Sequence, residues 1–113
     1  MSKLKPRAER WTVLLKLVER EQRLDVLNRY AVDEYVEATG ADFDVMPYGA
    51  NKCPLMGRDL SAMARSPARL LERHRTGIEG MAGMGFPRWV WSYRLTIKGK
   101  STLARAVAEE AKP

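Results

Sequence analysis

The chain has 113 residues, of which 45% are hydrophobic and 30% are charged, and its formal net charge is +6. This composition is typical of a globular domain and excludes a disordered polymer, and no apolar stretch reaches the length of a membrane span or forms an N-terminal secretion signal. The single cysteine, Cys53, excludes an internal disulfide and a cysteine-rich zinc site, so we expect one domain over 1–113 in a reducing cytoplasm.

The first predicted element is a helix over 8–23. Its apolar residues recur at helical spacing and form one stripe, made by Trp11, Leu14, Leu15 and Val18. Core packing is the favoured interpretation of this stripe. Dimerisation through the same face stays open, because the sequence does not separate the two uses.

The next predicted helix covers 32–39, where Val32 and Tyr35 share a face and Gly40 is a natural stop. Residues 24–30, which precede it, either extend the first helix or form a short strand. Both interpretations fit the sequence.

A third helix is predicted over 54–65, with Pro54 in its first turn and Pro67 just beyond its end. The connection at 41–52 is much longer than the turn of about three or four residues in a helix-turn-helix. Either that turn carries an insertion, or the two helices are not a strict helix-turn-helix.

Residues 70–97 are predicted to form a β-hairpin. Its second run alternates with a period of two and places Trp89, Trp91, Tyr93, Leu95 and Ile97 on one face. We expect this aromatic face to pack against the helices. If it were exposed instead, bases of a single-stranded nucleic acid would have a surface on which to stack.

A final helix is predicted over 102–111, with Ser101 as its N-cap. The run Leu-Leu-Glu-Arg-His-Arg at 70–75, a loop, and Tyr-Arg-Leu-Thr-Ile-Lys-Gly-Lys at 93–100 resemble the wing of winged helix-turn-helix DNA-binding proteins. The resemblance covers roughly residue 51 to the C-terminus and, more loosely, the helices before it. It implies an α+β winged-helix domain with three to four helices and a β-hairpin wing.

Positive charge is concentrated in the second half of the chain. Residues 1–51 carry a net charge of −1, whereas residues 52–113 carry +7. Such a one-sided distribution favours a phosphate-binding face, with a solvated basic surface as the alternative.

The resemblance implies a double-stranded DNA-binding transcriptional regulator, expected as a homodimer, whose helix 54–65 enters the major groove. Its arginines would read guanine edges or clamp phosphates, its small residues would contact base edges, and the wing would grip the backbone or minor groove. The expected DNA-binding residues are Arg58, Ser61, Ala62 and Arg65 on the helix, Lys52 and Arg69 at its ends, and Arg73, Arg75 and Arg88 in the wing.

The alternative function is a winged-helix protein-interaction module that inhibits or adapts a larger, DNA-handling machine. Such a module would present an exposed apolar patch, for which the sequence offers Met81, Met84, Phe86 and Pro87.

No catalytic, cofactor or metal site is expected, and therefore no enzyme. The segment 99–102 imitates the end of a phosphate-binding loop, but Arg94 stands where that motif requires glycine. The only histidine, His74, lies between two arginines that disfavour its proton. The carboxylates within 33–44 match no calcium loop and are interpreted as a solvated acidic face.

Overall fold

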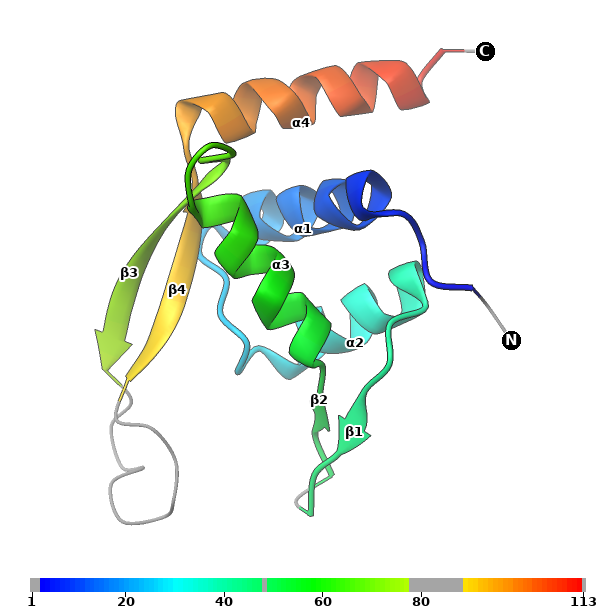
Figure 1. Ribbon diagram of the computed structural model, residues 1–113, viewed down its shortest axis with the longest axis vertical. Helices are drawn as coiled ribbons and strands as arrows, with labels where there is room; N and C mark the ends of the chain where they lie inside the picture. The colour runs from blue at the N-terminus through cyan, green and yellow to red at the C-terminus, as the bar shows by residue number, and fades with distance from the viewer. Residues whose placement is uncertain (1–2, 48, 78–88, 113) are drawn as a thin grey trace.

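The computed structural model describes residues 3–47, 49–77 and 89–112. Within these ranges the chain forms four helices and two small antiparallel sheets, which confirms the expected α+β class (Figure 1). In chain order the elements are α1 (Arg7–Glu21), α2 (Arg29–Thr39), β1 (Asp44–Val45), β2 (Asn51–Lys52), α3 (Pro54–Ala64), β3 (Leu71–Gly77), β4 (Trp89–Leu95) and α4 (Ile97–Glu110). None of the described helices is long and apolar enough to cross a membrane.

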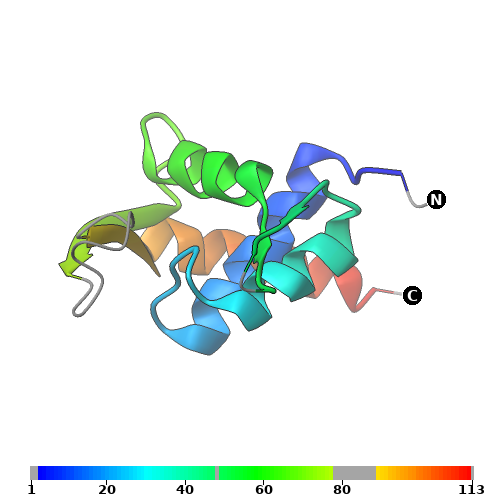
Figure 2. The same cartoon turned by 90° about the horizontal axis from the view of Figure 1, so that it is seen from below.

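Helix α1 is the centre of the fold. The other three helices and β4 all pack against it, while the β3–β4 hairpin extends away from the helices on the side opposite the two termini (Figures 1 and 2). Leu14, Leu15 and Val18 of α1 are at most 1% exposed. These residues of the apolar stripe of α1 are therefore buried in the core of a single chain. They are not available for dimerisation, so the sequence argument for a dimer through this face no longer applies.

The segment after α1 contains a single strand-like bridge. Helix α1 ends at Glu21, because the φ of Gln22 is positive, at 67°. Leu24 then exchanges backbone hydrogen bonds with Tyr93 of β4, at 3.0 and 2.8 Å. Neither interpretation of residues 24–30 holds throughout, because Leu24 alone forms the bridge and Arg29 and Tyr30 belong to α2. The bridge fastens the α1–α2 connection to the hairpin.

The long connection between α2 and α3 contains a hairpin of its own. Helix α2 ends at Gly40, whose φ of 76° suits glycine and whose N–H donates to the carbonyl of Val36. Strands β1 and β2 follow and pair antiparallel, with Asp44 opposite Lys52. The α2–α3 connection thus contains a β-hairpin, which we call the inserted hairpin, and it is not the short turn of a compact helix-turn-helix.

The β3–β4 hairpin pairs from Leu71 with Leu95 to Gly77 with Trp89. The prediction of one buried aromatic face on its second strand is only partly right. Tyr93 is 4% exposed, but Trp89 at the far end of β4 is 38% exposed. Ile97 is 85% exposed and belongs to α4, so the alternating pattern ends with the strand at Leu95.

Helix α4 begins earlier than predicted, and Thr96 replaces Ser101 as its N-cap. The Thr96 hydroxyl accepts a hydrogen bond from the Gly99 N–H at 2.9 Å and donates one to the Arg69 carbonyl at 2.8 Å. A Cβ on Gly99 would overlap the Leu70 carbonyl oxygen. The glycine that resembled part of a phosphate loop is therefore required by close packing of α4 on the chain before β3.

A buried carboxylate joins the three N-terminal helices. Asp59 of α3 is 5% exposed and accepts hydrogen bonds from Tyr35 Oη of α2 at 2.7 Å and from two α1 side chains. These are Arg10, through Nε at 3.0 Å and Nη2 at 3.3 Å, and Trp11, through Nε1 at 3.3 Å. Burial and the bond to Asp59 raise the pKa of the Tyr35 phenol, so Tyr35 remains a donor.

Replacing this carboxylate should destabilise the protein strongly. Asp59→Ala leaves the Arg10 charge and the buried Tyr35 hydroxyl without their acceptor, and should lower the free energy of unfolding by about 3 kcal/mol. Urea denaturation followed by circular dichroism measures the change. Glu37→Ala, at an exposed position of α2, is the control and should stay within about 0.5 kcal/mol of wild type. Equal stabilities for the two variants would contradict the assigned role of Asp59.

Gly99→Ala should also destabilise, although alanine is the better helix former. The added methyl group meets the backbone of Leu70, which cannot rotate away as a side chain would. We expect a loss of about 1–3 kcal/mol in the same denaturation experiment, as for other overpacked sites. Ala104→Gly, at an exposed position in α4, should cost only the helix propensity of about 1 kcal/mol. A stabilised Gly99→Ala protein would refute the close approach.

Candidate nucleic-acid interface

The candidate interface is built on α3 and on the hairpin that follows it. Pro54 occupies the first turn of α3, where its missing N–H costs nothing, and the inner stripe of Met56, Leu60 and Met63 is buried. The helix ends at Ala64. Arg65, predicted to be its last residue, is instead the C-cap, with extended φ and ψ of −89° and 159°.

Two of the predicted DNA-binding residues lie beside carboxylates. Lys52 lies directly opposite Asp44 in the register of the inserted hairpin. Arg58 lines a hollow of about 480 Å³ with Asp42 and Asp44, next to the exposed side chain of Phe43. The local positive field at Lys52 and Arg58 is therefore reduced by these neighbours.

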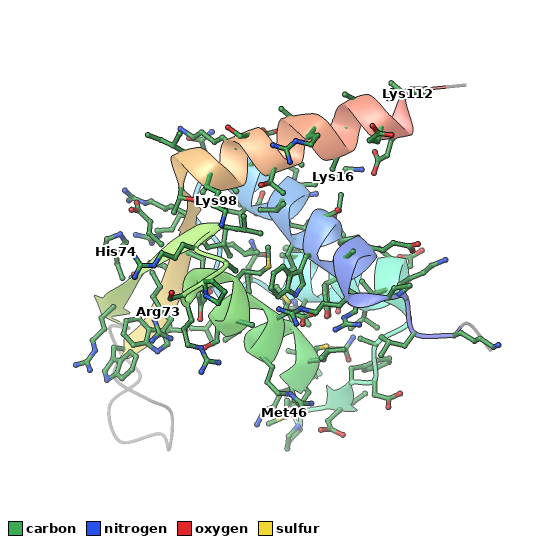
Figure 3. All side chains as sticks on the ribbon, turned by 45° about the horizontal axis from the view of Figure 1, so that its top comes forward. Lys16, Met46, Arg73, His74, Lys98 and Lys112 are labelled. Carbon is green, nitrogen blue, oxygen red and sulfur yellow. The ribbon has the colours of Figure 1, made fainter. Side chains whose placement is uncertain are left out.

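Two other predicted residues, Arg65 and Arg73, lie where α3 meets the hairpin. Arg75 follows two positions along β3, and its Cζ atom lies 5.6 Å from the ring centre of Trp91, over which Arg73 also lies. Arg73 Nη1 donates to the Ser61 hydroxyl of α3, at 3.4 Å, and in Figure 3 Arg73 lies between the hairpin and α3 while His74 lies on the opposite side. Burial raises the pKa of Tyr93, and the positive charges of Arg73 and Arg65 oppose that rise, so both guanidinium groups lie near this phenol. We call Arg65, Arg73 and Arg75 the arginine cluster.

The two wing arginines stack on tryptophans. The Arg73 Cζ atom lies 4.4 Å from the ring centre of Trp91, and the Arg75 Cζ atom lies 4.5 Å from that of Trp89. The two indole rings meet edge to face, with centres 5.1 Å apart. This pairing was not foreseen from the sequence. The sequence does contain two arginines spaced two residues apart and two tryptophans with the same spacing. Only the strand register, however, shows which arginine meets which tryptophan.

The remaining predicted residues are dispersed. Ala62 is half-buried and lines a different hollow, beside Trp11 of α1. Arg69 is exposed in the α3–β3 connection, with φ of 46°, and its carbonyl accepts from Thr96. Arg88, like Met81, Met84, Phe86 and Pro87, lies outside the described residues.

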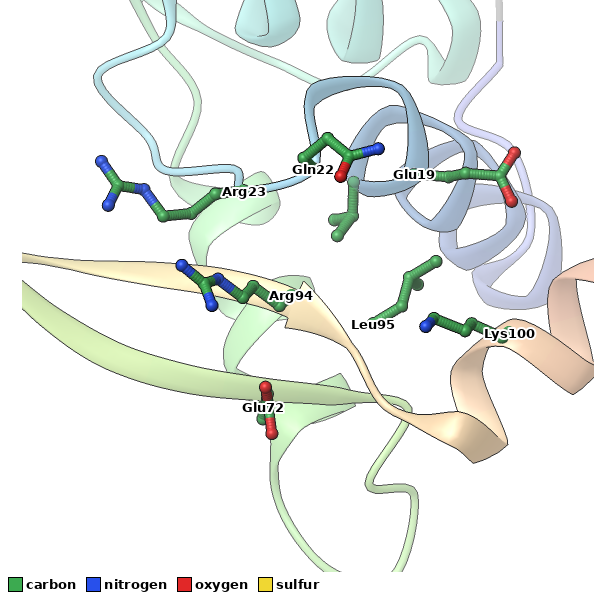
Figure 4. A pocket seen from close by; sticks show the side chains of 8 residues that line it. Glu19, Gln22, Arg23, Glu72, Arg94, Leu95 and Lys100 are labelled. Carbon is green, nitrogen blue, oxygen red and sulfur yellow. The ribbon is translucent and has the colours of Figure 1, made fainter.

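The opposite face of the hairpin carries charges of both signs. A cavity of about 580 Å³ lies there between the end of α1, the hairpin and the start of α4 (Figure 4). Its charged lining consists of Glu19, Arg23, Glu72, Arg94 and Lys100. Two carboxylates among three cations provide no field of one sign for a polyanion, which distinguishes this face from the arginine cluster.

Potential metal ligands are dispersed among the described residues, and the cysteine is buried. Within 3–47, 49–77 and 89–112, no three metal-ligating side chains come together. Cys53, the N-cap of α3, is buried, and burial raises the pKa of its thiol, which disfavours the reactive thiolate.

Comparison with known proteins identifies no relative of this chain. No protein-family model, curated protein or solved structure matches it. The function is therefore inferred from the fold and from the side-chain geometry.

Removing the charge of Arg73 should raise the pKa of Tyr93 further. In the wild type that pKa already exceeds the unfolded value of 10.0, so the stability linked to this phenol is present below pH 10 and is lost as the pH rises above it. Titration of ¹³Cζ-labelled tyrosine by NMR, with Tyr93→Phe for assignment, should show the upward shift in Arg73→Ala. Arg94→Ala, on the opposite hairpin face, should leave it unchanged. An unaltered Tyr93 titration in Arg73→Ala would place Arg73 away from the phenol.

Proposed function

We propose that this protein is a winged-helix regulator that binds double-stranded DNA, with α3 in the major groove and the β3–β4 hairpin along the adjacent backbone. The order of its elements supports this proposal. Helix α3 is followed directly by an antiparallel hairpin and then by α4, and Leu24 adds a strand-like bridge at the edge of β4. The inserted β1–β2 hairpin is the main departure from a compact helix-turn-helix.

The observation that carries the proposal is the arginine cluster. Arg65, from the end of α3, and Arg73 of β3 are both close enough to Tyr93 to oppose the rise in its pKa that burial causes. No carboxylate of the described residues forms an ion pair with either of them or with Arg75. Uncompensated arginines on a helix end and an adjoining hairpin are suited to the phosphates of one duplex.

The geometry divides the tasks among the predicted residues. Ser61 already accepts a hydrogen bond from Arg73, so its role is to position that arginine rather than to read a base. Arg58 is exposed on α3 and is the side chain left to contact a base edge, as arginine does with guanine. Arg65, Arg73 and Arg75 then supply phosphate contacts that set affinity and salt dependence.

A protein-interaction role is the second candidate, and the inserted hairpin favours it. Phe43 is 45% exposed and Val45 of β1 is 68% exposed, while Leu4 nearby is 49% exposed. Leu4 and Phe43 line the same hollow as Arg58. Exposed apolar side chains of this kind suit a protein partner better than a nucleic acid.

Duplex binding should be tight at low salt and should weaken steeply as salt is added. For a fluorescein-labelled 20-base-pair duplex of arbitrary sequence, fluorescence anisotropy gives the slope of log K against log salt concentration. Each phosphate contact contributes about −0.9 to that slope, so Arg65→Ala/Arg75→Ala should flatten it by about 1.8.

The matched control is Arg94→Ala/Arg105→Ala, which removes the same charge from the opposite hairpin face and from α4. Its slope should equal that of the wild type. If the slope flattened equally in both double variants, binding would depend on net charge alone and the assigned DNA-binding face would be wrong. An absence of duplex binding at about 50 mM salt would refute DNA binding and favour the protein-interaction role.

A further inference from the structure

The arginines and tryptophans of the hairpin form an alternating ladder, made by Trp89, Arg75, Trp91 and Arg73. The strand register places Arg75 opposite Trp91 and Gly77 opposite Trp89. Because Gly77 has no side chain, and even a Cβ at this position would meet no atom within 4 Å, Arg75 has room to lean diagonally over Trp89. Arg75 also lies 5.6 Å from the centre of Trp91. Each guanidinium is thus held by an indole ring.

This stacking argues against the aromatic rings as a platform for bases. A base would need the open face of an indole ring, but guanidinium groups already lie over Trp91 and Trp89. Only Trp89 is as much as 38% exposed, whereas Trp91 is half-buried against the core. Single-stranded nucleic acid would therefore have to displace two cation–π contacts before its bases stacked.

The same stacking leaves the hydrogen-bond donors of the arginines available. The five N–H groups of a guanidinium lie in its plane, so a ring beneath the plane covers none of them. A guanidinium held against the hairpin cannot extend to the floor of a groove, and Arg73 is in addition bonded to Ser61. The donors of exposed Arg75, and those of half-buried Arg73 that Ser61 does not accept, are the ones left for phosphate oxygens of a docked duplex.

We propose that the ladder is a preorganised clamp for backbone phosphates, in which Arg73 and Arg75 donate to phosphate oxygens and Trp89 and Trp91 are positioning residues. This inference rests on the proposed duplex binding and deepens it. The clamp is independent of base sequence, because a phosphate contact carries no sequence information. Lysine cannot replace arginine in it, because lysine keeps the charge but loses the planar, stacked fork of donors.

Arginine-to-lysine exchange separates the geometry of the clamp from its charge. Arg73→Lys/Arg75→Lys should bind the labelled duplex about tenfold more weakly, and equally so for duplexes of different sequence, with an unchanged salt slope. Trp89→Phe/Trp91→Phe should weaken binding about threefold, because phenylalanine is the poorer cation–π partner. Arg94→Lys, on the opposite face of the same hairpin, is the matched control and should bind as the wild type does. Thermal unfolding of every variant verifies that each is folded.

The possible outcomes separate a failure of the clamp from a failure of the proposed duplex binding. If the wild type binds the duplex and the double-lysine variant binds equally well, the ladder is not a clamp, while the proposed function stands. If the double-lysine variant weakens binding to one sequence only, Arg73 or Arg75 reads bases and the clamp is wrong. If the wild type binds single-stranded DNA more tightly than the duplex, the rings serve as a stacking platform, which overturns the clamp. If the wild type binds no duplex, both proposals fail together.

Discussion

The position of α3 depends on one buried carboxylate. An aspartate that is 5% exposed would be costly to bury alone, yet Asp59 is surrounded by donors from two other helices. Because a hydrogen bond depends on direction as well as distance, these donors fix the rotation of α3 about its own axis. The apolar neighbours Met56, Leu60 and Met63 would tolerate some rotation, whereas Asp59 would lose its partners. The face that α3 presents to solvent, including Arg58, is therefore set from inside the core.

The hairpin is held to the helices by contacts that are mostly backbone in character. Leu24 bonds to Tyr93 on one edge of β4, and Thr96 bonds to the Arg69 carbonyl where the hairpin begins. Gly99 allows α4 to approach the Leu70 carbonyl closely. These contacts anchor the base of the hairpin, while its far end projects from the body of the protein (Figure 1). An arginine on the projecting part needs another means of being held, and the indole rings provide it.

Local pattern predicted the helices well and failed where distant parts of the chain meet. Helical spacing indicated the stripe of α1, and alternation indicated β4, because both depend on near neighbours. Asp59 also lies at helical spacing from Met56 and Met63, which was a usable signal that it faces inward. Its partners Arg10 and Tyr35, however, are 49 and 24 residues away in sequence, and no local pattern joins them. The pairing of Arg75 with Trp89 was hidden for a similar reason, since a long connection does not fix strand register.

The count of charged residues predicted that the second half of the sequence is basic. It did not predict which of these residues share a surface in the folded protein. Lys52, Arg58, Arg65, Arg73 and Arg75 contribute equally to the formal charge, and the fold then treats them differently. The inserted hairpin brings Asp42 and Asp44 beside the first two, whereas Arg65 and Arg73 lie near Tyr93 and Arg75 stacks on Trp89. A polyanion responds to the local field rather than to the sum. The insertion therefore does more than lengthen a turn. It places carboxylates beside Arg58, whereas the C-terminal end of α3, at Arg65, stays basic.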